Sequence, residues 1–501
     1  MNAGAFLTNA AAVHGDRPAI VFADRVITYA ELEIASGRAA GGLLHAGLRP
    51  GDRILLWMRN HPEFVISLFA GLRAGLTVVP TNVRLHPREV GYIATNSGAA
   101  AIIHDAEFES AATRISEESG SLQRFRSDAL PQGSAALSDP RPEDPAWLFY
   151  TSGTTGKPKG ATLTHRNLAA MTTACLADLC SFQPEDVVLH VAPLTHGSGL
   201  YLLPAIARGA SNVISHHASF DPSEVFALIE HHHVSSIAFV VPTMIVRLSN
   251  DPGAKSHRLA SLRTVIYGGA PMYVEDLRKA VQMFGQIFVQ LYGQGETPMT
   301  GTYIRAADHR FDGAEWERRM GSIGIPRSNV EIRILDANDR PQPAGEVGEI
   351  VVRGDTVMQG YWRDPEATRI ALRDGWLHTG DLGYVDGGGY VFLVDRAKDM
   401  IISAGNNIYA REVEEALLTH PAVGEVAVVG VPDADWGESV HAVVVLRAGQ
   451  EVEPRVLIQH CKDRIASYKK PRTVEFIAEL PKSAYGKVLK RELRERYLRR
   501  A

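Results

Sequence analysis

The sequence predicts an α/β protein: a large N-terminal domain of doubly wound αβ subdomains plus a β-rich subdomain, followed by a small α+β C-terminal domain. Length gives the first reason. The chain has 501 residues, whereas a single core stops growing at about 250–300 residues, so at least two domains are needed. The second reason is a regular alternation of short apolar runs with helical patterns, which predicts a mostly parallel sheet.

The alternation is clearest in the first hundred residues. Thr28 and Glu31 stand in the T-x-x-E order of a capping box, which predicts that a helix begins there. Strands are expected at Ala19–Phe22, Ile54–Met58, Leu76–Pro80 and Ala101–His104, and helices over about residues 29–45, 62–74 and 87–96.

The same rhythm continues toward residue 300, and a β-rich stretch follows it. Between roughly residues 321 and 395, glycines punctuate strand-like runs such as Glu349–Val352, which indicates the β-rich subdomain. Strands before that stretch are expected at Val187–Val191, Ser236–Val241, Thr264–Tyr267 and Ile287–Leu291.

After Arg396 the pattern restarts, and about a hundred residues of mixed character form one small domain. We therefore divide the chain into domains 1–395 and 396–501. The second is expected to hold a helix near 410–420, strands Val426–Val431 and His441–Leu446, a helix around 454–466 and a strand Thr473–Ile477.

Composition excludes several function classes. The chain carries 52 Lys+Arg against 57 Asp+Glu, a formal charge of −5, and is 45% hydrophobic. These values suit a folded globular protein, exclude collagen-like and disordered classes, and lack the basic excess of a general nucleic-acid binder. We expect no nucleic-acid partner.

Cysteine usage and hydropathy predict a cytoplasmic protein. The three cysteines, Cys175, Cys180 and Cys461, show no CxxC spacing, so neither a disulfide framework nor a zinc ribbon is indicated. The N-terminus lacks the basic and apolar regions of a signal peptide, and no apolar run approaches the roughly 20 residues of a membrane span.

The segment with the strongest chemical signal reads YTSGTTGKPKG, from Tyr150 to Gly160. It lies between the strand-like runs Ala146–Tyr150 and Ala161–Thr164, and a helical apolar pattern follows from Leu168 to Leu179. Its glycines let the backbone approach a ligand, and its hydroxyls, lysines and amides are the donors that a polyphosphate requires. A Walker P-loop would need GxxxxGK[ST], which is absent, so ordinary P-loop phosphoryl transfer is disfavoured.

This segment resembles the phosphate loop of the adenylate-forming (ANL) superfamily, which includes acyl-CoA synthetases, adenylation domains and firefly luciferase. Six further segments match that superfamily in order across nearly the whole chain. They are Ala192–His196 (APLTH), Gly268–Pro271 (GGAP), Tyr292–Thr297 (YGQGET), Gly375–Asp381 (GWLHTGD), Asp395–Asp399 (DRAKD) and Pro481–Lys487 (PKSAYGK). The resemblance implies a large N-terminal domain and a small, mobile C-terminal one.

The resemblance also implies a reaction in two steps. A carboxylic acid attacks ATP to give an acyl-AMP with release of pyrophosphate, and the acyl group then passes to a thiol, here coenzyme A. Because a carboxylate repels the triphosphate that it must attack, the site has to place cations and backbone amides around the α-phosphate.

By resemblance, the nucleotide site is assigned residue by residue. Glu296 ligates the Mg²⁺ that bridges phosphate oxygens, Asp381 accepts hydrogen bonds from the ribose hydroxyls, and Arg396 is a second ribose or phosphate contact. The phosphates are cradled by Thr151, Ser152, Gly153, Thr154, Thr155 and Lys159, and the adenine slot is formed by Gly268, Gly269, Ala270, Pro271, Tyr292 and Gly293.

The C-terminal domain supplies a catalytic lysine and a hinge by the same resemblance. Lys487 bridges the substrate carboxylate and the nucleotide during adenylation, and the domain then swings about Lys398 so that the thiol can enter. For CoA, Trp436 is expected to stack on the adenine, while Arg84, Lys470 and Arg472 meet the phosphates; Tyr468–Arg472 equally fits a solvated basic turn.

Two departures from the superfamily pattern stand out. Gly295 replaces the usual Thr before the Mg²⁺ ligand, which removes one phosphate hydroxyl unless Thr297 substitutes for it. Ser403–Asn407 (SAGNN) replaces the usual SGGEN, which removes a carboxylate from the segment expected to line the CoA tunnel.

The acid is expected to lack an amine. Amino-acid-activating relatives place an Asp in the region 196–204 to bind the ammonium, because a buried cation needs a counter-charge; residues 196–204 here contain none. An aryl acid or a medium- to long-chain aliphatic acid, as in fatty acid metabolism, is favoured. His196 is the gate residue by resemblance, and the acyl pocket is assigned to His196, Phe239, Gly268, Gly293 and Met299.

Histidines at 216–217 and 231–233 lack a convincing metal-ligand spacing, and we do not predict a metal site from them. His231–His233 are more typical of a helix end.

The sequence thus predicts an AMP-forming acid–CoA ligase with domain alternation, using ATP, Mg²⁺ and CoA; a homodimer is compatible with it. Two alternatives stay open. One is an acyl-adenylating enzyme that loads a carrier protein or makes an oxidised product, and the other is a nucleotide-sensing module without turnover.

Overall fold

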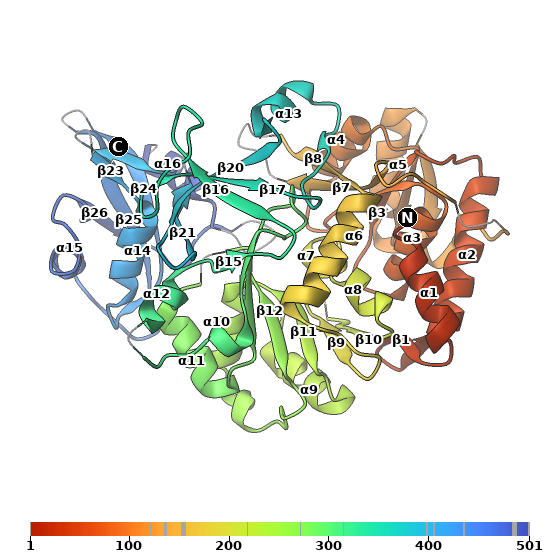
Figure 1. Ribbon diagram of the computed structural model, residues 1–501, viewed down its shortest axis with the longest axis horizontal. Helices are drawn as coiled ribbons and strands as arrows, with labels where there is room; N and C mark the ends of the chain where they lie inside the picture. The colour runs from red at the N-terminus through yellow and green to blue at the C-terminus, as the bar shows by residue number, and fades with distance from the viewer. Residues whose placement is uncertain are drawn as a thin grey trace. The chain divides into compact units, whose positions relative to one another are not determined.

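The computed structural model describes residues 2–120, 122–134, 138–151, 157–217, 219–270, 272–313, 315–396, 399–403, 406–433, 436–482 and 488–498, except the side chains of Glu317, Arg396 and Asn407 (Figure 1). The chain divides into two compact units. Unit 1 comprises Met1–Met272, Arg278–Ile332 and Val352–Leu377, and unit 2 comprises Tyr273–Leu277, Arg333–Val351 and His378–Ala501. Residues 378–395 thus group with the C-terminal part, and the division at 395/396 stays a prediction.

A seven-stranded sheet in unit 1 carries the phosphate-loop segment. Its four central pairings, β4 with β7, β3 with β4, β3 with β5 and β5 with β6, are parallel, and the edge pairings of β8 are antiparallel. The strand order is β18 (Gly360–Tyr361), β8 (Lys159–Thr164), β7 (Pro145–Thr151), β4 (Thr77–Pro80), β3 (Arg53–Trp57), β5 (Ala101–His104) and β6 (Gln123–Arg126).

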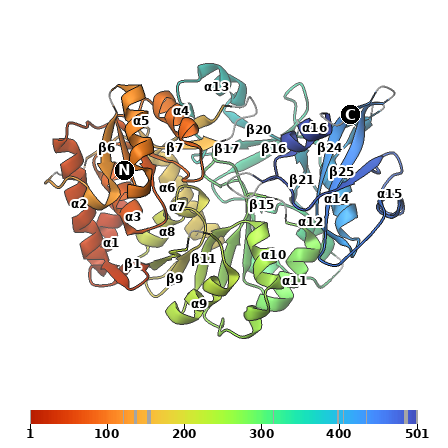
Figure 2. The same cartoon turned by 180° about the vertical axis from the view of Figure 1, so that it is seen from behind.

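Side-chain alternation explains why this sheet is covered on both faces. Successive residues of a strand point to opposite faces, and in β3 Ile54 and Leu56 join one core while Leu55 and Trp57 join another. The first core includes α2 (Tyr29–His45) and α3 (Pro62–Arg73). The second includes α4 (Pro87–Ser97) and α5 (Glu109–Ser119), which lie side by side in both views (Figure 1, Figure 2).

A nine-stranded sheet, also within unit 1, has the same plan of a parallel centre with antiparallel edges. Its order is β15 (Ile325–Pro326), β14 (Thr302–Ile304), β13 (Phe288–Tyr292), β12 (Thr264–Tyr267), β11 (Ser236–Val240), β9 (Val187–His190), β10 (Ser211–Ile214), β1 (Pro18–Phe22) and β2 (Arg25–Thr28). The two sheets confirm the predicted doubly wound α/β class.

The β-rich stretch forms a third sheet, and the C-terminal part forms a fourth. The third has the order β16 (Glu331–Leu335), β17 (Gly348–Arg353), β20 (Trp376–Val385), β19 (Leu372–Arg373), with β21 (Val391–Arg396) beside β20. The fourth has the order β23 (Asn406–Ile408), β22 (Ile401–Ser403), β25 (Gly437–Leu446), β24 (Val423–Asp433), with β26 (Thr473–Phe476) beside β25.

Helices cover both faces of the fourth sheet. Val428 and Val440 pack with α14 (Ala410–Leu418) and α15 (Pro454–Lys462), whereas Val429 and Val431 pack with Leu493 of α16 (Lys490–Leu498). The predicted α+β character of this part is therefore correct.

Predicted helix boundaries agree closely in unit 1. Helix α2 begins at Tyr29 behind a complete capping box between Thr28 and Glu31. Two helices differ from expectation. Helix α15 ends at Lys462 and not near residue 466, and beyond it Ile465 donates its backbone N–H to Cys461 O. Helix α6 is followed directly by a short π-helix at Cys175–Leu179.

The remaining helices connect the strands. They are α1 (Ala5–His14), α6 (His165–Ala174), α7 (Gly197–Leu200), α8 (Leu202–Ala207), α9 (Pro222–His232), α10 (Pro242–Asn250), α11 (Val274–Phe284), α12 (Trp316–Gly321) and α13 (Pro365–Ala371). Among the helices of the described residues, none is long and apolar enough to cross a membrane.

Candidate active site

The predicted phosphate-loop segment lies between two strands that pair antiparallel, β7 and β8. Thr151 is the last residue of β7 and pairs with Lys159, the first residue of β8. The two strands predicted on either side of this segment are therefore confirmed. Ser152, Gly153, Thr154 and Thr155, assigned to phosphate binding, lie outside the described residues.

Glu296 is held against β7. Its side chain is buried, with 7% exposure, and its Oε1 accepts hydrogen bonds from Thr151 Oγ1 at 3.2 Å and from Tyr361 OH at 2.8 Å. Neither hydroxyl uses Oε2. Because Mg²⁺ takes oxygen ligands, an oriented carboxylate here fits the ligand role assigned to Glu296.

Tyr361 is a residue of this site that the sequence analysis did not find. It lies in β18, which pairs with β8, and Lys159 Nζ is 5.3 Å from the centre of its ring. Burial and the neighbouring Glu296 raise the pKa of Tyr361, so its hydroxyl stays protonated and can donate. No local pattern marks Tyr361, because the pairing of β18 with β8 creates the contact.

The structure explains why glycine occupies position 295. A Cβ atom there would lie 2.5 Å from Phe149 Cδ1 and 2.9 Å from Thr151 Cγ2, so a side chain at this position would require these two packed side chains to shift. The Phe149 ring thus fills the space that a side chain at position 295 would occupy. Thr297, the suggested substitute hydroxyl, bonds through Oγ1 to the N–H and C=O of Gln294 in its own turn, and its contact with nucleotide stays a prediction.

His196 joins the same cluster through Phe149. The two ring centres are 4.8 Å apart with an interplanar angle of 41°. Burial lowers the pKa of His196 to about 4, so the imidazole is neutral at pH 7. A neutral imidazole is compatible with a gate for a carboxylate-bearing substrate.

Asn60 positions the segment that leads to His196. Its Nδ2 donates to Ala192 O at 2.9 Å, and its Oδ1 accepts from Leu194 N–H at 2.8 Å. The Asn60 side chain therefore pairs with the backbone of this segment much as a neighbouring strand would, although Asn60 and Leu194 are 134 positions apart in the sequence. Sequence reasoning missed Asn60 because its partners are backbone atoms.

Two residues assigned to the acyl pocket adopt left-handed backbone conformations. Phe239 has φ of 53° and Met299 has φ of 58°, which is uncommon for residues other than glycine and is concentrated at functional sites. At Phe239 the register of β11 against β12 shifts. The Phe239 ring stacks on Tyr201 at 6.1 Å and leaves no room for a Cβ at Gly197, which would lie 2.6 Å from it.

The glycines of the predicted adenine slot permit close backbone approach. A Cβ at Gly268 would lie 2.4 Å from Leu291 O, and one at Gly293 would lie 2.5 Å from Met299 C. Gly268–Ala270 follow β12 and Tyr292 ends β13, and these two strands are parallel neighbours, so the assigned segments share one sheet edge. Pro271 lies outside the described residues.

In unit 2, Asp381 and Arg396 are direct partners in the pairing of β20 with β21. Asp381 is buried, with 3% exposure, and its backbone N–H donates to Thr379 Oγ1 at 3.1 Å. Two residues predicted to contribute to nucleotide binding are therefore adjacent. The predicted hinge Lys398 and catalytic Lys487 lie outside the described residues.

The structure brings together two of the four residues assigned to CoA. The Arg472 guanidinium carbon lies 3.9 Å from the centre of the Trp436 ring, a cation–π contact, and the Trp436 side chain is 39% exposed. Lys470 Nζ donates to Ser467 O at 3.0 Å. Arg84 belongs to unit 1, where its backbone N–H donates to Asn82 Oδ1 at 2.8 Å.

Comparison with known proteins identifies the class. The family described as AMP-binding enzyme matches residues 7–362, and the family described as AMP-binding enzyme C-terminal domain matches residues 412–487. The chain belongs to the AMP-binding enzyme family, within the adenylate-forming superfamily that its motifs resemble. Within that superfamily it is an acid–thiol ligase of the acyl-CoA synthetase type, which confirms the predicted enzyme class.

One curated relative and two solved structures illustrate the similarity. Feruloyl-CoA synthase from an Amycolatopsis species is 41% identical over 482 residues, 94% of each chain. ATP-bound MatB from Rhodopseudomonas palustris superposes with a TM-score of 0.89 at 32% identity over 99% of both chains. The o-succinylbenzoate CoA synthetase MenE from Bacillus subtilis, with its acyl-adenylate intermediate, gives a TM-score of 0.87 at 32% identity over 97% of both.

Proposed function

We propose that this enzyme joins an aromatic carboxylic acid of the hydroxycinnamate type to coenzyme A through an acyl-AMP. The observation that carries the adenylation chemistry is Glu296, a buried carboxylate oriented by Thr151 and Tyr361 beside the strands that flank the predicted phosphate loop. The acid class rests on the 41% identity to a feruloyl-CoA synthase and on the lack of an acidic residue in 196–204. A medium- or long-chain aliphatic acid is the second candidate class.

In the first step a carboxylate oxygen of the acid attacks the α-phosphorus of ATP, and pyrophosphate leaves. The activation barrier arises largely because the carboxylate and the triphosphate are both anions and repel each other. Hydrogen-bond donors and cations already positioned at the phosphates are therefore the main source of catalysis. We assign these donors to Thr151, Lys159 and the loop residues Ser152–Thr155. Glu296 would hold Mg²⁺, which when bound neutralises charge on the phosphate oxygens.

The ribose and the reacting carboxylate need their own partners. We assign the ribose hydroxyls to the Asp381 carboxylate, with Arg396 as a second contact, and the bridging cation of the adenylation step to Lys487. His196, neutral at pH 7, adds no second charge where the acid enters.

In the second step the CoA sulfur attacks the acyl carbonyl, and AMP leaves with one oxygen of the original acid. We propose that rotation about Lys398 separates the two steps. Trp436 and Arg472, already stacked on each other, are assigned to the CoA adenine and its phosphates, with Lys470 and Arg84 as further phosphate contacts.

An acid panel assayed for pyrophosphate release tests this proposal. Ferulate, a medium-chain fatty acid, an amino acid and no acid are compared, each with and without CoA. We expect release with ferulate, and CoA-dependent formation of AMP and thioester. Release without CoA-dependent turnover would favour carrier-protein loading, and tight ATP binding without acid-dependent release would indicate a nucleotide sensor; either result contradicts the proposal.

We also infer a cytoplasmic enzyme that forms a homodimer. The cytoplasmic inference is supported by three free cysteines, of which Cys175 and Cys461 are buried. Cell fractionation and light scattering of the purified chain test the two statements, and a membrane-bound pool or a monomer would contradict them respectively.

A further inference from the structure

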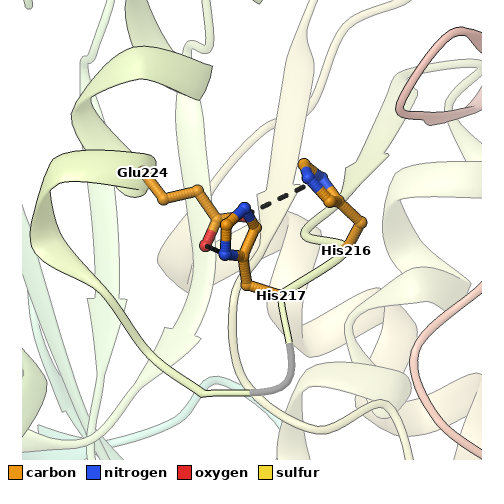
Figure 3. Close-up of side chains that lie close together, drawn as sticks. All are labelled: His216, His217 and Glu224. Carbon is orange, nitrogen blue, oxygen red and sulfur yellow. Dashed lines mark ion pairs between the residues drawn. The ribbon is translucent and has the colours of Figure 1, made fainter.

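A group of side chains in unit 1, separate from the residues assigned to the reaction, has the donors of a transition-metal site. His216 and His217 follow strand β10, and Glu224 lies in the first turn of α9. One ligand atom from each of the three lies within 4.8 Å of the other two, and among the described residues they form the one group of this kind. Figure 3 shows both imidazole rings converging on the Glu224 carboxylate.

We propose that His216, His217 and Glu224 bind a divalent transition-metal ion of the Zn²⁺ class, with water completing the coordination. Two imidazoles and one carboxylate are the protein ligands of several zinc sites that keep a fourth position open. Imidazole nitrogen suits Zn²⁺, Ni²⁺ or Cu²⁺, whereas Mg²⁺ and Ca²⁺ prefer oxygen alone.

Distances within the group favour an ion over direct hydrogen bonding. His216 Nδ1 lies 3.9 Å from Glu224 Oε1, and His217 Nδ1 lies 3.5 Å from Glu224 Oε2. Both exceed hydrogen-bond range. Ligands bound to zinc at about 2.0–2.2 Å with tetrahedral angles lie roughly 3.3–3.6 Å apart, so small rotations of the rings suffice to close the site.

Other histidine–carboxylate pairs in the chain provide the contrast. His61, His257 and His378 hydrogen bond carboxylates directly, at 2.7–3.0 Å. The pairs His104–Glu109 and His441–Glu475 are also long, at 3.9 and 3.7 Å, but each brings a single imidazole to its carboxylate. Only in the group of His216, His217 and Glu224, among these histidine–carboxylate pairs of the described residues, do two imidazoles approach one carboxylate at distances longer than a hydrogen bond.

The carboxylate is oriented, while the rings are accessible. Ser215 Oγ donates to Glu224 Oε1 at 2.9 Å, the kind of outer-shell hydrogen bond that orients a metal-ligating carboxylate. The Glu224 side chain is only 9% exposed, and those of His216 and His217 are 43% and 49% exposed. An ion can therefore reach the site from solvent without opening the core.

The position of the site predicts a structural consequence. Ser215 continues the pairing of β10 with β9 through its N–H to His190 O, so a bound ion would tie the end of a central strand to helix α9 across residues 216–224. Because the three ligands come together only in the folded protein, an ion that binds them stabilises the folded state over the unfolded one. Metal binding is expected to raise the melting temperature without depending on the ligase reaction.

Zinc titration of the full-length chain, without a histidine tag and after chelator treatment, tests the proposal. Calorimetry and equilibrium dialysis at pH 7.5 are expected to show that the wild type binds one equivalent of Zn²⁺. H216A/H217A should not bind this equivalent, and E224Q should bind it at least about tenfold more weakly. Cobalt substitution should give the visible absorption of a four-coordinate site in the wild type alone.

The matched control is H231A/H232A, which removes an adjacent histidine pair at the C-terminal end of the same helix. This variant is expected to keep the equivalent of zinc and the zinc-induced rise in melting temperature. Equal zinc binding by H216A/H217A and wild type would overturn the proposal, as would loss of the site in the control variant alone. Ligase activity of every variant reports correct folding, because these residues are outside the assigned reaction site.

Discussion

Glu296 and Glu224 are two nearly buried carboxylates, both oriented by hydroxyl groups, yet we assign them to different chemistry. Glu296 accepts from Thr151 and Tyr361 and lies beside the strands that flank the predicted phosphate loop, among residues that we assign to anionic ligands. Glu224 accepts from Ser215 and faces two imidazoles. The comparison shows that a preoriented carboxylate by itself defines no function, since its neighbours decide which cation it holds and what that cation does.

The largest expected effect comes from E296Q. Glutamine keeps an oxygen that can accept from Thr151 and Tyr361 but removes the charge that would bind Mg²⁺. Losing one preorganised electrostatic group at a transition state costs about 10²–10³ in rate, so acid-dependent pyrophosphate release should fall by at least that factor. E224Q is the matched control and should retain wild-type rates; equal losses in the two variants would erase the distinction between the carboxylates.

His61 provides a third arrangement, in which one imidazole hydrogen bonds two carboxylates, those of Glu63 and Asp105. Burial lowers the pKa of His61, but hydrogen bonds to Asp105 and Glu63 outweigh it and raise the pKa to about 9. Because the folded pKa exceeds the unfolded value of 6.5, the stabilisation is complete below pH 6.5 and is lost as pH rises through about 9.

H61A should therefore lower the free energy of unfolding by up to about 3 kcal/mol at pH 6 and by much less at pH 9.5. Denaturant unfolding of wild type and variant at the two pH values measures the difference. A destabilisation independent of pH would show that packing of the ring, and not its charge, is what matters.

Y361F separates orientation of Glu296 from packing around it. The variant keeps the ring beside Lys159 and removes only the hydroxyl that donates to the carboxylate. A hydrogen bond to a charged group contributes about 1.5–3 kcal/mol, so kcat for adenylation should fall roughly ten- to a hundredfold, with the melting temperature nearly unchanged. Unaltered kcat with an increased KM for ATP would instead assign Tyr361 to uniform nucleotide binding.

G295A tests whether Phe149 dictates the glycine before Glu296. The added methyl would contact the Phe149 ring, and such overpacking costs about 1–3 kcal/mol. We expect reduced stability and activity in G295A and partial recovery in the double variant G295A/F149L. If F149L does not relieve the G295A defect, the steric explanation of this position is wrong.

Local patterns in the sequence predicted much of the fold. The capping box at Thr28 placed the start of α2, and strands β5 and β12 match their expected ranges, because propensity and periodicity act over a few residues. The strands that flank the predicted phosphate loop were likewise visible as two apolar runs on either side of a donor-rich segment.

Contacts between residues far apart in the chain cannot be predicted from local patterns in the sequence. Tyr361 reaches Glu296 across 65 positions, and Asn60 binds the segment before His196 across more than 130. The spacing of His216 and His217 alone does not predict a metal site, because Glu224 comes close to them only in the folded chain. Such neighbours are set by tertiary packing, which periodicity does not encode.

The most direct test of the acyl-AMP route follows an oxygen atom. Ferulate labelled with ¹⁸O in both carboxylate positions is supplied with ATP and CoA, and the nucleotide product is analysed by mass spectrometry. Attack of the carboxylate on the α-phosphorus predicts AMP carrying one ¹⁸O for each thioester formed. Unlabelled AMP, or ADP with label in the released phosphate, would contradict adenylation as the reaction of this enzyme.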